Sequence, residues 1–193
     1  MKILGVSGSP RKNGNTDILI KRALDLCKKN GAEIEFLSLS DSRLEYCDAC
    51  YSCKMGSCIK KDDVQKILNS MTKSDAIIIG SPTYFSSISG RLKTLFDRSL
   101  PLRIHGYKLR DKVGGAIAVG GSRNGGQEFV IRDIHNWMLL HEMIVVSDRK
   151  TAHFGGIAVG RNPGDVLKDE TGLKTVDNLA IHIVEMTERL LKC

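Results

Sequence analysis

The chain has 193 residues, with 29 Lys and Arg against 22 Asp and Glu, which gives a formal net charge of +7. This length suits one domain, 1–193, with enough core to fold without cross-links. The positive charges are scattered in pairs, without a basic stripe or interleaved aromatic residues, so nucleic acid is not an expected partner. No apolar segment is long enough for a membrane span or a signal peptide. We therefore expect a cytoplasmic protein, in which thiols stay reduced.

The first predicted elements are a short buried strand at 2–6, a loop rich in Gly, Ser and Asn at 7–16, and a helix whose apolar residues recur at helical spacing. A loop between a strand and a helix N-terminus presents backbone N–H groups to an anion. The motifs GxGxxG and GxxxxGK followed by Ser or Thr are absent, but the hydroxyl groups of this loop suit a terminal phosphate monoester. A turn without a ligand, capped by Asn15 or Thr16, is the alternative.

A second strand is predicted at 32–39, and four cysteines follow it in the pattern CxxCxxCxxxxC. They are Cys47, Cys50, Cys53 and Cys58. The compact spacing is similar to that of [4Fe–4S] sites. Structural zinc sites usually have two well-separated CxxC pairs, and disulfides indicate oxidised, secreted domains. We therefore favour an iron–sulfur cluster bound by all four thiolates, and zinc or inert thiols remain the alternatives.

A third strand is predicted at 75–80, and its all-isoleucine centre is typical of a strand buried on both faces. The loop that follows this strand includes Pro82, Thr83, Tyr84 and Phe85. A fourth strand at 112–119 leads into a second glycine-rich loop at 120–126. Both loops leave the carboxyl end of a predicted strand, as the first loop does.

A fifth strand is predicted at 143–146, followed by a long irregular segment at 148–163 and a C-terminal amphipathic helix. Strands that alternate with helices favour an α/β fold with one doubly wound, five-stranded parallel sheet. In the strand order 2-1-3-4-5, ligands bind in the crevice between strands one and three. The loops after strands one, three and four then meet at this crevice, where a flat ring system and its phosphate fit. The cysteine loop, which follows strand two, is expected at the same edge of the sheet.

Two stretches resemble motifs of the flavodoxin-like NAD(P)H-dependent FMN reductases. The first is Gly-Ser-Pro-Arg…Gly-Asn-Thr after strand one, and the second is Ser-Pro-Thr-Tyr-Phe…Ser-Gly-Arg-Leu-Lys-Thr-Leu-Phe-Asp-Arg after strand three. With the four cysteines after strand two, essentially the whole chain resembles the archaeal-type iron–sulfur flavoproteins. The resemblance implies a flavodoxin-like fold that binds one FMN and, at 47–58, one [4Fe–4S] cluster in each subunit of a homo-oligomer, either a dimer or a tetramer.

The resemblance also implies roles for individual residues. Four residues of the first loop would hold the FMN phosphate: Ser9, Arg11, Asn15 and Thr16. Four residues after strand three would line the flavin ring: Pro82, Thr83, Tyr84 and Phe85. Two glycines would lie opposite them: Gly121 and Gly125. Taken from the residues alone, Tyr84 and Phe85 can also pack on the sheet, and Arg11 can be a solvated loop charge.

The function implied by the resemblance is electron transfer between a ferredoxin-like donor and a small-molecule or protein acceptor. No Ser-His-Asp order or pair of carboxylates stands out, so no catalytic side chain is expected, and whether the protein is an enzyme stays open. Two alternatives remain. One is an NAD(P)H-dependent FMN or quinone reductase whose cysteines hold a structural zinc, and the other is a non-catalytic regulator that binds flavin or metal.

Overall fold

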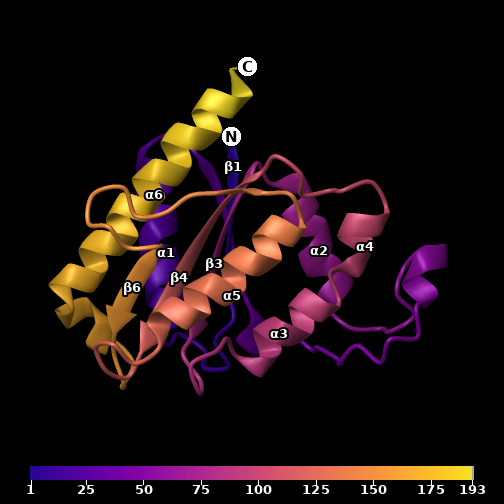
Figure 1. Ribbon diagram of the computed structural model, residues 1–193, viewed down its shortest axis with the longest axis horizontal. Coiled ribbons are helices and arrows are strands. Elements are labelled where there is room, and N and C mark those ends of the chain that lie inside the picture. The colour runs from indigo at the N-terminus through magenta and orange to yellow at the C-terminus, as the bar shows by residue number, and fades with distance from the viewer. Residues whose placement is uncertain (193) are drawn as a thin grey trace.

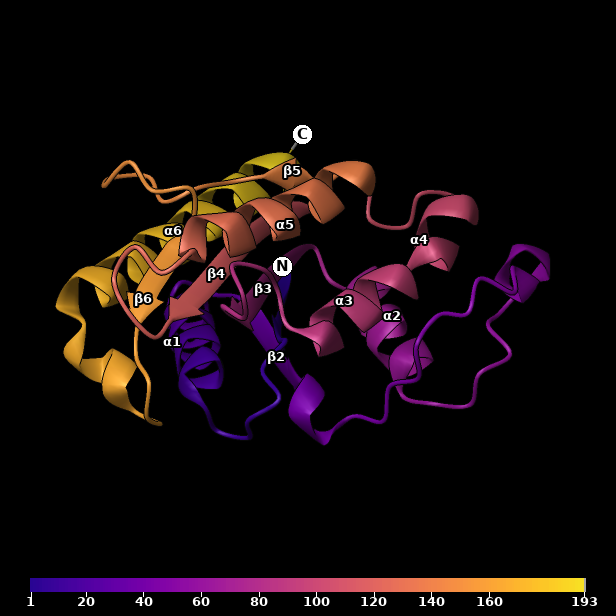
Figure 2. The same cartoon turned by 60° about the horizontal axis from the view of Figure 1, so that its bottom comes forward.

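The computed structural model describes residues 1–192, which form a parallel sheet with helices on both faces (Figure 1; Figure 2). The strand order is β2-β1-β3-β4-β5, and a further strand, β6, also pairs with β4. The strands are β1 (Lys2–Ser7), β2 (Glu33–Ser38), β3 (Ala76–Pro82), β4 (Val113–Gly120), β5 (Ile144–Val145) and β6 (Gly156–Val159). The predicted fold class and strand order are confirmed, with one addition in the fifth position of the sheet.

Helices cover the sheet in two layers. On one face lie α1 (Asn15–Lys29) and α6 (Glu170–Leu191), and on the other lie α2 (Val64–Lys73), α3 (Gly90–Asp97) and α5 (Gln127–Leu140), with the short α4 (Leu100–Ile104) beyond α3. Ile77 and Ile79 pack in the core with α2, α3 and α5, whereas Ile78 packs with α1 and α6. Because successive side chains of a strand point to opposite faces, this alternation accounts for the all-isoleucine centre of β3. No helix within residues 1–192 is long and apolar enough to cross a bilayer.

The fifth position of the sheet is divided between two short strands. β5 pairs with the first residues of β4, and β6 pairs with its last residues, Ile117–Gly120. Between β5 and β6 the chain leaves the sheet, at 146–155. The strand predicted at 143–146 is therefore shorter than expected, and the prediction of an irregular segment throughout 148–163 is wrong for Gly156–Val159.

Two adjacent glycines allow β6 to fit between β4 and α6. A Cβ at Gly156 would lie 2.9 Å from Val176 Cγ2 in α6, and a Cβ at Gly155 would collide with the backbone oxygen of Ala116 in β4. Glycine is needed at these two positions because of contacts with segments distant in sequence, so the local pattern of residues does not indicate strand β6. Because β6 is parallel to β4, the residues after β6 arrive at the same edge of the sheet as the loop after β4.

Candidate functional site

A cavity of about 250 Å³ lies where β1, β3 and β4 end, at the crevice predicted from the strand order. We call it the crevice cavity. Eight of its lining residues belong to the set predicted from sequence: Ser9, Arg11, Asn15, Thr16, Pro82, Thr83, Tyr84 and Gly121. Three further residues line it: Val119, Gly160 and Arg161. Phe85 and Gly125 are not among the described residues that line this cavity.

The first loop is shaped by its own hydrogen bonds and by a tie to β3. Ser9 Oγ accepts the N–H of Arg11 at 3.0 Å, and the N–H of Gly8 donates to Gly80 O at 2.7 Å. A Cβ at Gly8 would lie 2.8 Å from Leu92 Cβ in α3, so this close approach requires glycine. No side chain within the described residues caps the N-terminus of α1. Its first N–H groups are therefore placed to bind an anion in the loop.

The segment 160–164, which follows β6, is the part of the crevice wall that the sequence analysis missed. Arg161 lines the cavity, and its backbone oxygen accepts a hydrogen bond from Arg11 Nη1 at 3.2 Å. The side chain of Asn15 also bonds to this segment. These residues could have been predicted only from a strand at β6, because the pairing of β6 with β4 brings them to the crevice.

The residues after β3 form a tight turn beside the cavity. Tyr84 and Ser87 exchange two backbone hydrogen bonds, of 3.0 and 3.1 Å. The two central residues, Phe85 and Ser86, have φ angles of 49° and 59°. Such angles are uncommon outside glycine and concentrate at functional sites. The turn directs the Phe85 side chain outward, where it is fully exposed.

Thr83 carries a polar atom without a partner. Its N–H donates to Val119 O at 2.8 Å, which joins the loop after β3 to β4. Its Oγ1 is buried and has no hydrogen-bond partner in the described part of the chain. Buried hydroxyl groups are nearly always hydrogen-bonded, so this atom is one that a polar ligand in the cavity would satisfy.

The two predicted glycines have different positions. Gly121 lines the cavity, whereas the N–H of Gly125 donates to Gln127 Oε1 at 2.8 Å at the start of α5. Gly126 has a φ of 96°, and a Cβ there would lie 2.7 Å from Ser86 Oγ. The loop at 120–126 therefore packs against the turn after β3, and this contact requires glycine.

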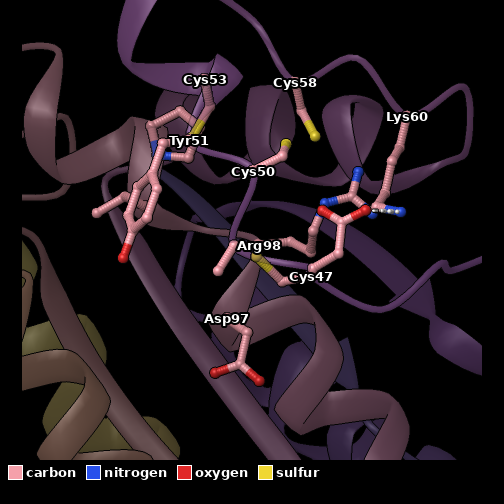
Figure 3. Close-up of a pocket in the computed structure, with 12 residues that line it drawn as sticks. Cys47, Cys50, Tyr51, Cys53, Cys58, Lys60, Asp97 and Arg98 are labelled. Carbon is pink, nitrogen blue, oxygen red and sulfur yellow. Dashed lines mark ion pairs between the residues drawn. The ribbon is translucent and has the colours of Figure 1, made fainter.

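All four predicted cysteine ligands line a second cavity, of about 320 Å³ (Figure 3). We call it the cysteine cavity. None of these four thiols is in a disulfide; Cys47 and Cys50 are exposed, and Cys53 and Cys58 are partly buried. The other lining residues are Asp48, Ala49, Tyr51, Lys60, Asp97, Arg98, Leu100 and Pro101.

The donor set of the cysteine cavity fits a four-thiolate group. Four cysteine thiolates are the usual ligands of a [4Fe–4S] cluster and of many structural zinc ions. Within residues 1–192, no three candidate ligands are already drawn together as a coordination site. The pKa of Cys53 is raised, first by burial and then by the negative charge of Cys58, with smaller contributions from Cys47 and Cys50. The thiols are thus close enough for the charge of one thiolate to oppose ionisation of another. A bound cation would remove this opposition to ionisation.

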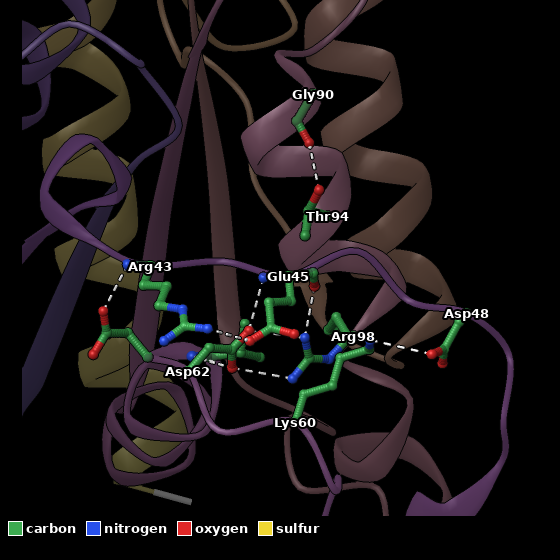
Figure 4. A network of polar contacts seen from close by, with 10 residues as sticks. Arg43, Glu45, Asp48, Lys60, Asp62, Gly90, Thr94 and Arg98 are labelled. Atoms are coloured by element: carbon green, nitrogen blue, oxygen red, sulfur yellow. Dashed lines mark hydrogen bonds and ion pairs between the residues drawn. The ribbon is translucent and has the colours of Figure 1, made fainter.

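The base of the cysteine loop is closed by hydrogen bonds and a buried ion pair (Figure 4). The N–H of Arg43 donates to Asp63 Oδ2 at 2.6 Å, and the N–H of Asp63 donates to Arg43 O at 3.0 Å. The N–H of Glu45 donates to Asp62 Oδ2 at 2.8 Å. The same carboxylate pairs with Arg98 at 2.9 Å, and the two side chains are 1% and 3% exposed. Such a buried pair holds both partners in place, because losing one partner leaves the other charge unpaired.

A histidine contacts the far end of the loop. His105 follows α4, and its Nε2 lies 2.7 Å from Cys53 O and 3.1 Å from Gly56 O. Since both carbonyl oxygens can only accept, the ring nitrogen donates a shared hydrogen bond to them. The cysteine loop is therefore held to the rest of the domain at its base and also at its outer part, Cys53–Gly56.

The two cavities lie at opposite ends of α3. Ser89, the N-cap of α3, donates its hydroxyl to Gly8 O at 2.5 Å beside the crevice, whereas Asp97 and Arg98 line the cysteine cavity. A helix of eight residues spans about 12 Å. The cysteine loop begins at the predicted edge of the sheet, but the cavity that its thiols line does not lie beside the crevice. The loop leaves the carboxyl end of β2 but extends away from the crevice to α4 (Figure 1).

Comparison with known proteins gives consistent results along the whole chain. A family model described as NADPH-dependent FMN reductase matches residues 1–155. An iron-sulfur flavoprotein of Methanocaldococcus jannaschii is 52% identical over 194 residues, which covers 100% of both chains. An iron-sulfur flavoprotein of Methanosarcina thermophila is 42% identical over 193 residues, which covers 100% of this chain and 98% of that protein.

The structure is also similar to solved structures. A flavodoxin from the domain Archaea superposes with a TM-score of 0.64 at 16% identity, covering 97% of this chain and 99% of that one. At this identity the similarity concerns the fold alone. It identifies the fold as flavodoxin-like.

Proposed function

Since the chain belongs to the NADPH-dependent FMN reductase family, and within it to the iron–sulfur flavoproteins, we propose that it transfers electrons through a [4Fe–4S] cluster and FMN. Membership in this family supports a flavin redox function. The donor in our proposal is a ferredoxin-like one-electron carrier, the acceptor is a small molecule or a protein, and the location is the cytoplasm. The observation that carries the proposal is that four thiols line one cavity of a chain whose crevice has a phosphate-type loop.

The crevice cavity offers suitable groups for FMN. Its phosphate would be held by hydroxyl, amide and guanidinium groups of the first loop, from Ser9, Arg11, Asn15 and Thr16. The ring would be bordered by Pro82, Thr83 and Tyr84 on one side and Gly121 on the other, with Phe85 and Gly125 flanking the site. The unpartnered Oγ1 of Thr83 supports this assignment, because it lacks the polar partner that a flavin would supply. Bound FMN supplies the chemistry of accepting one or two electrons, and these residues bind and orient it.

The cysteine cavity would hold the cluster through Cys47, Cys50, Cys53 and Cys58. Within one chain, α3 separates the two cavities by about 12 Å of helix. The function that we propose also includes a homo-oligomer, a dimer or a tetramer, in which the cysteine cavity of one subunit faces the crevice cavity of another. Assembly would then be part of the electron path.

The proposal is tested by anaerobic purification followed by analysis of iron, sulfide and flavin in the native protein and in Cys50→Ala. We expect iron and flavin together in the native protein, and flavin without the cluster in the variant. Cys27→Ala is the matched control, because Cys27 is buried in α1 away from the cavity and both cofactors should persist. Full iron content in Cys50→Ala would refute the ligand assignment. Reduction of the flavin by reduced ferredoxin, followed spectroscopically, tests the donor.

A second candidate is an NAD(P)H-dependent FMN or quinone reductase with zinc at the cysteine cavity. It is favoured by the family model, whose own description is an NADPH-dependent reductase. This candidate predicts a yellow, zinc-containing protein that oxidises NADPH rapidly. The first candidate predicts a brown, iron-containing protein that reacts faster with reduced ferredoxin than with NADPH.

A further inference from the structure

Arg98 occupies an unusual position in the wall of the cysteine cavity. It follows α3, its side chain is only 3% exposed, and it lines the cavity together with the four cysteines. Figure 3 shows its guanidinium group close to the sulfur atoms of Cys50 and Cys58. A buried cation therefore faces the group of thiols.

The partner of Arg98 lies behind it. Asp62 accepts from Nη1 at 2.9 Å and from Nη2 at 3.1 Å, and Glu45 O accepts from Nη1 at 2.6 Å. Asp62 is not among the described residues that line the cavity, whereas Arg98 is. Figure 4 shows the pair of Arg98 and Asp62. Because Arg98 lines the cavity and Asp62 does not, the ion pair is a fixed dipole whose positive end faces the cavity.

Lys60, the other cation of the cavity wall, has a counter-charge that lies inside the cavity. Lys60 pairs with Asp48 at 3.1 Å, and both residues line the cavity. Their charges therefore largely cancel at the cavity surface. Arg98 is the cation whose counter-charge lies outside the cavity.

Arg98 also has hydrogen-bonding capacity to spare. Its Nε is buried and finds no hydrogen-bond partner among residues 1–192. N–H groups directed at cluster sulfur, and nearby positive charge, stabilise the reduced, more negative state of an iron–sulfur site.

We propose that Arg98 is a positioning residue of the four-thiolate site, which directs an N–H group at the bound thiolates and places a fixed positive charge beside the bound metal. In this role Arg98 slows metal loss and raises the reduction potential of the cluster. For the potential, the inference rests on the proposed function. For metal retention, it requires only that the four thiols bind metal.

The test compares Arg98→Gln, which removes the charge, with Arg98→Lys, which keeps it. Arg43→Gln is the matched control, since Arg43 lies at the base of the same loop, pairs with Glu45 and is 74% exposed on its side chain. Two quantities are measured: the midpoint potential of the cluster by anaerobic redox titration, and the affinity of the metal-free protein for Zn²⁺ by competition with a chromophoric chelator.

We expect Arg98→Gln to bind Zn²⁺ about 10- to 100-fold more weakly, as is usual when a residue supporting a metal ligand is removed, and to shift the cluster potential to more negative values. Arg98→Lys should recover part of both effects, and Arg43→Gln should match the native protein. Zn²⁺ affinity and potential unchanged in Arg98→Gln would overturn the inference. If native protein takes up zinc but no cluster, the proposed function fails, and the Zn²⁺ titration still decides the role of Arg98.

Loss of Arg98 leaves Asp62 buried without its partner, which can unfold the loop. The double variant Arg98→Gln/Asp62→Asn removes both charges and avoids this defect. It should show the same weakened Zn²⁺ binding as Arg98→Gln. A double variant with native Zn²⁺ affinity would mean that Arg98 serves only to neutralise Asp62, and would refute its role toward the thiols.

Discussion

The amide side chain of Asn15 connects the start of α1 to Gly164, beyond β6. Its Oδ1 accepts the N–H of Gly164 at 2.8 Å, and its Nδ2 donates to Asn162 O at 2.9 Å. One side chain in the proposed phosphate loop therefore also fixes the wall of the crevice that is 149 residues away in sequence.

Replacement of Asn15 should weaken FMN binding through this wall. In Asn15→Ala two hydrogen bonds are lost, each worth about 0.5–1.5 kcal/mol, so we expect roughly tenfold weaker binding. Asn15→Asp should be worse, because it places a negative charge beside the phosphate. The measurement is quenching of FMN fluorescence by the metal-free protein. Asn69→Ala serves as control, since Asn69 accepts a hydrogen bond from Gln65 on the solvent-exposed face of α2, away from the crevice. Native affinity in both Asn15 variants would remove Asn15 from the site.

Thr83→Val should act in opposite directions on the empty and the loaded protein. Valine has nearly the same shape as threonine but lacks the buried Oγ1 that has no partner in the described part of the chain. Without FMN the variant should be as stable as the native protein or more stable, and with FMN it should lose about 0.5–1.5 kcal/mol of binding free energy. Thermal unfolding with and without FMN measures both. Equal stabilisation by FMN in the two proteins would mean that Thr83 does not contact the flavin.

Alkylation should separate the structural cysteine from the proposed ligands. Burial in α1 raises the pKa of Cys27 to about 12, so its reactive thiolate is scarce at pH 8. In the metal-free native protein, iodoacetamide should modify the exposed Cys47 and Cys50 and spare Cys27. Mass spectrometry of the digested protein gives the extent at each site. Denaturant should make Cys27 react like the others, and early modification of Cys27 in native protein would contradict its burial.

One buried histidine, His141, and one partly buried histidine, His135, should make the protein less stable in mild acid. Burial lowers the pKa of His141 to about 4, with a contribution from Arg103, and burial lowers the pKa of His135 to about 4 as well. An unfolded histidine titrates near 6.5, so between about pH 6.5 and 4 the unfolded state binds more protons. The free energy of unfolding should therefore fall as the pH falls through this window and level off below it.

Urea unfolding at several pH values measures this dependence. His141 is 5% exposed and lies 2.9 Å from Ser99 Oγ, so its contribution is on the order of 3 kcal/mol across the window. In His141→Gln the free energy of unfolding should depend less steeply on pH. His135 should account for part of the pH dependence that remains. A slope unchanged in His141→Gln would show that His141 is not buried in its neutral form.

Much of the architecture could be predicted from the sequence because it depends on local patterns. Ile77, Ile78 and Ile79 mark a strand buried on both faces, and the first loop is recognisable by its composition. The four thiols of the cysteine cavity follow from spacing alone. Each of these features is determined by residues that are close together in the sequence.

The features that could not be predicted depend on long-range contacts. β6 exists because Gly155 and Gly156 fit against Ala116 and Val176, and none of these pairs is adjacent in sequence. The pairing of Arg98 with a carboxylate 36 residues earlier has no local signature either. The direction of the cysteine loop follows from such contacts, which is why the sequence predicted the edge of the sheet where the loop begins but not the direction in which it extends.

The crevice cavity and the cysteine cavity share no lining residue, so a single substitution can alter one of them directly without touching the other. On the proposed function, a gene copy that lost Cys50 and a second copy whose crevice cavity no longer bound FMN would each encode a protein with one working cavity. Co-expressed in one cell, their products would form mixed assemblies in which a working pair reappears, so two individually defective alleles would complement each other.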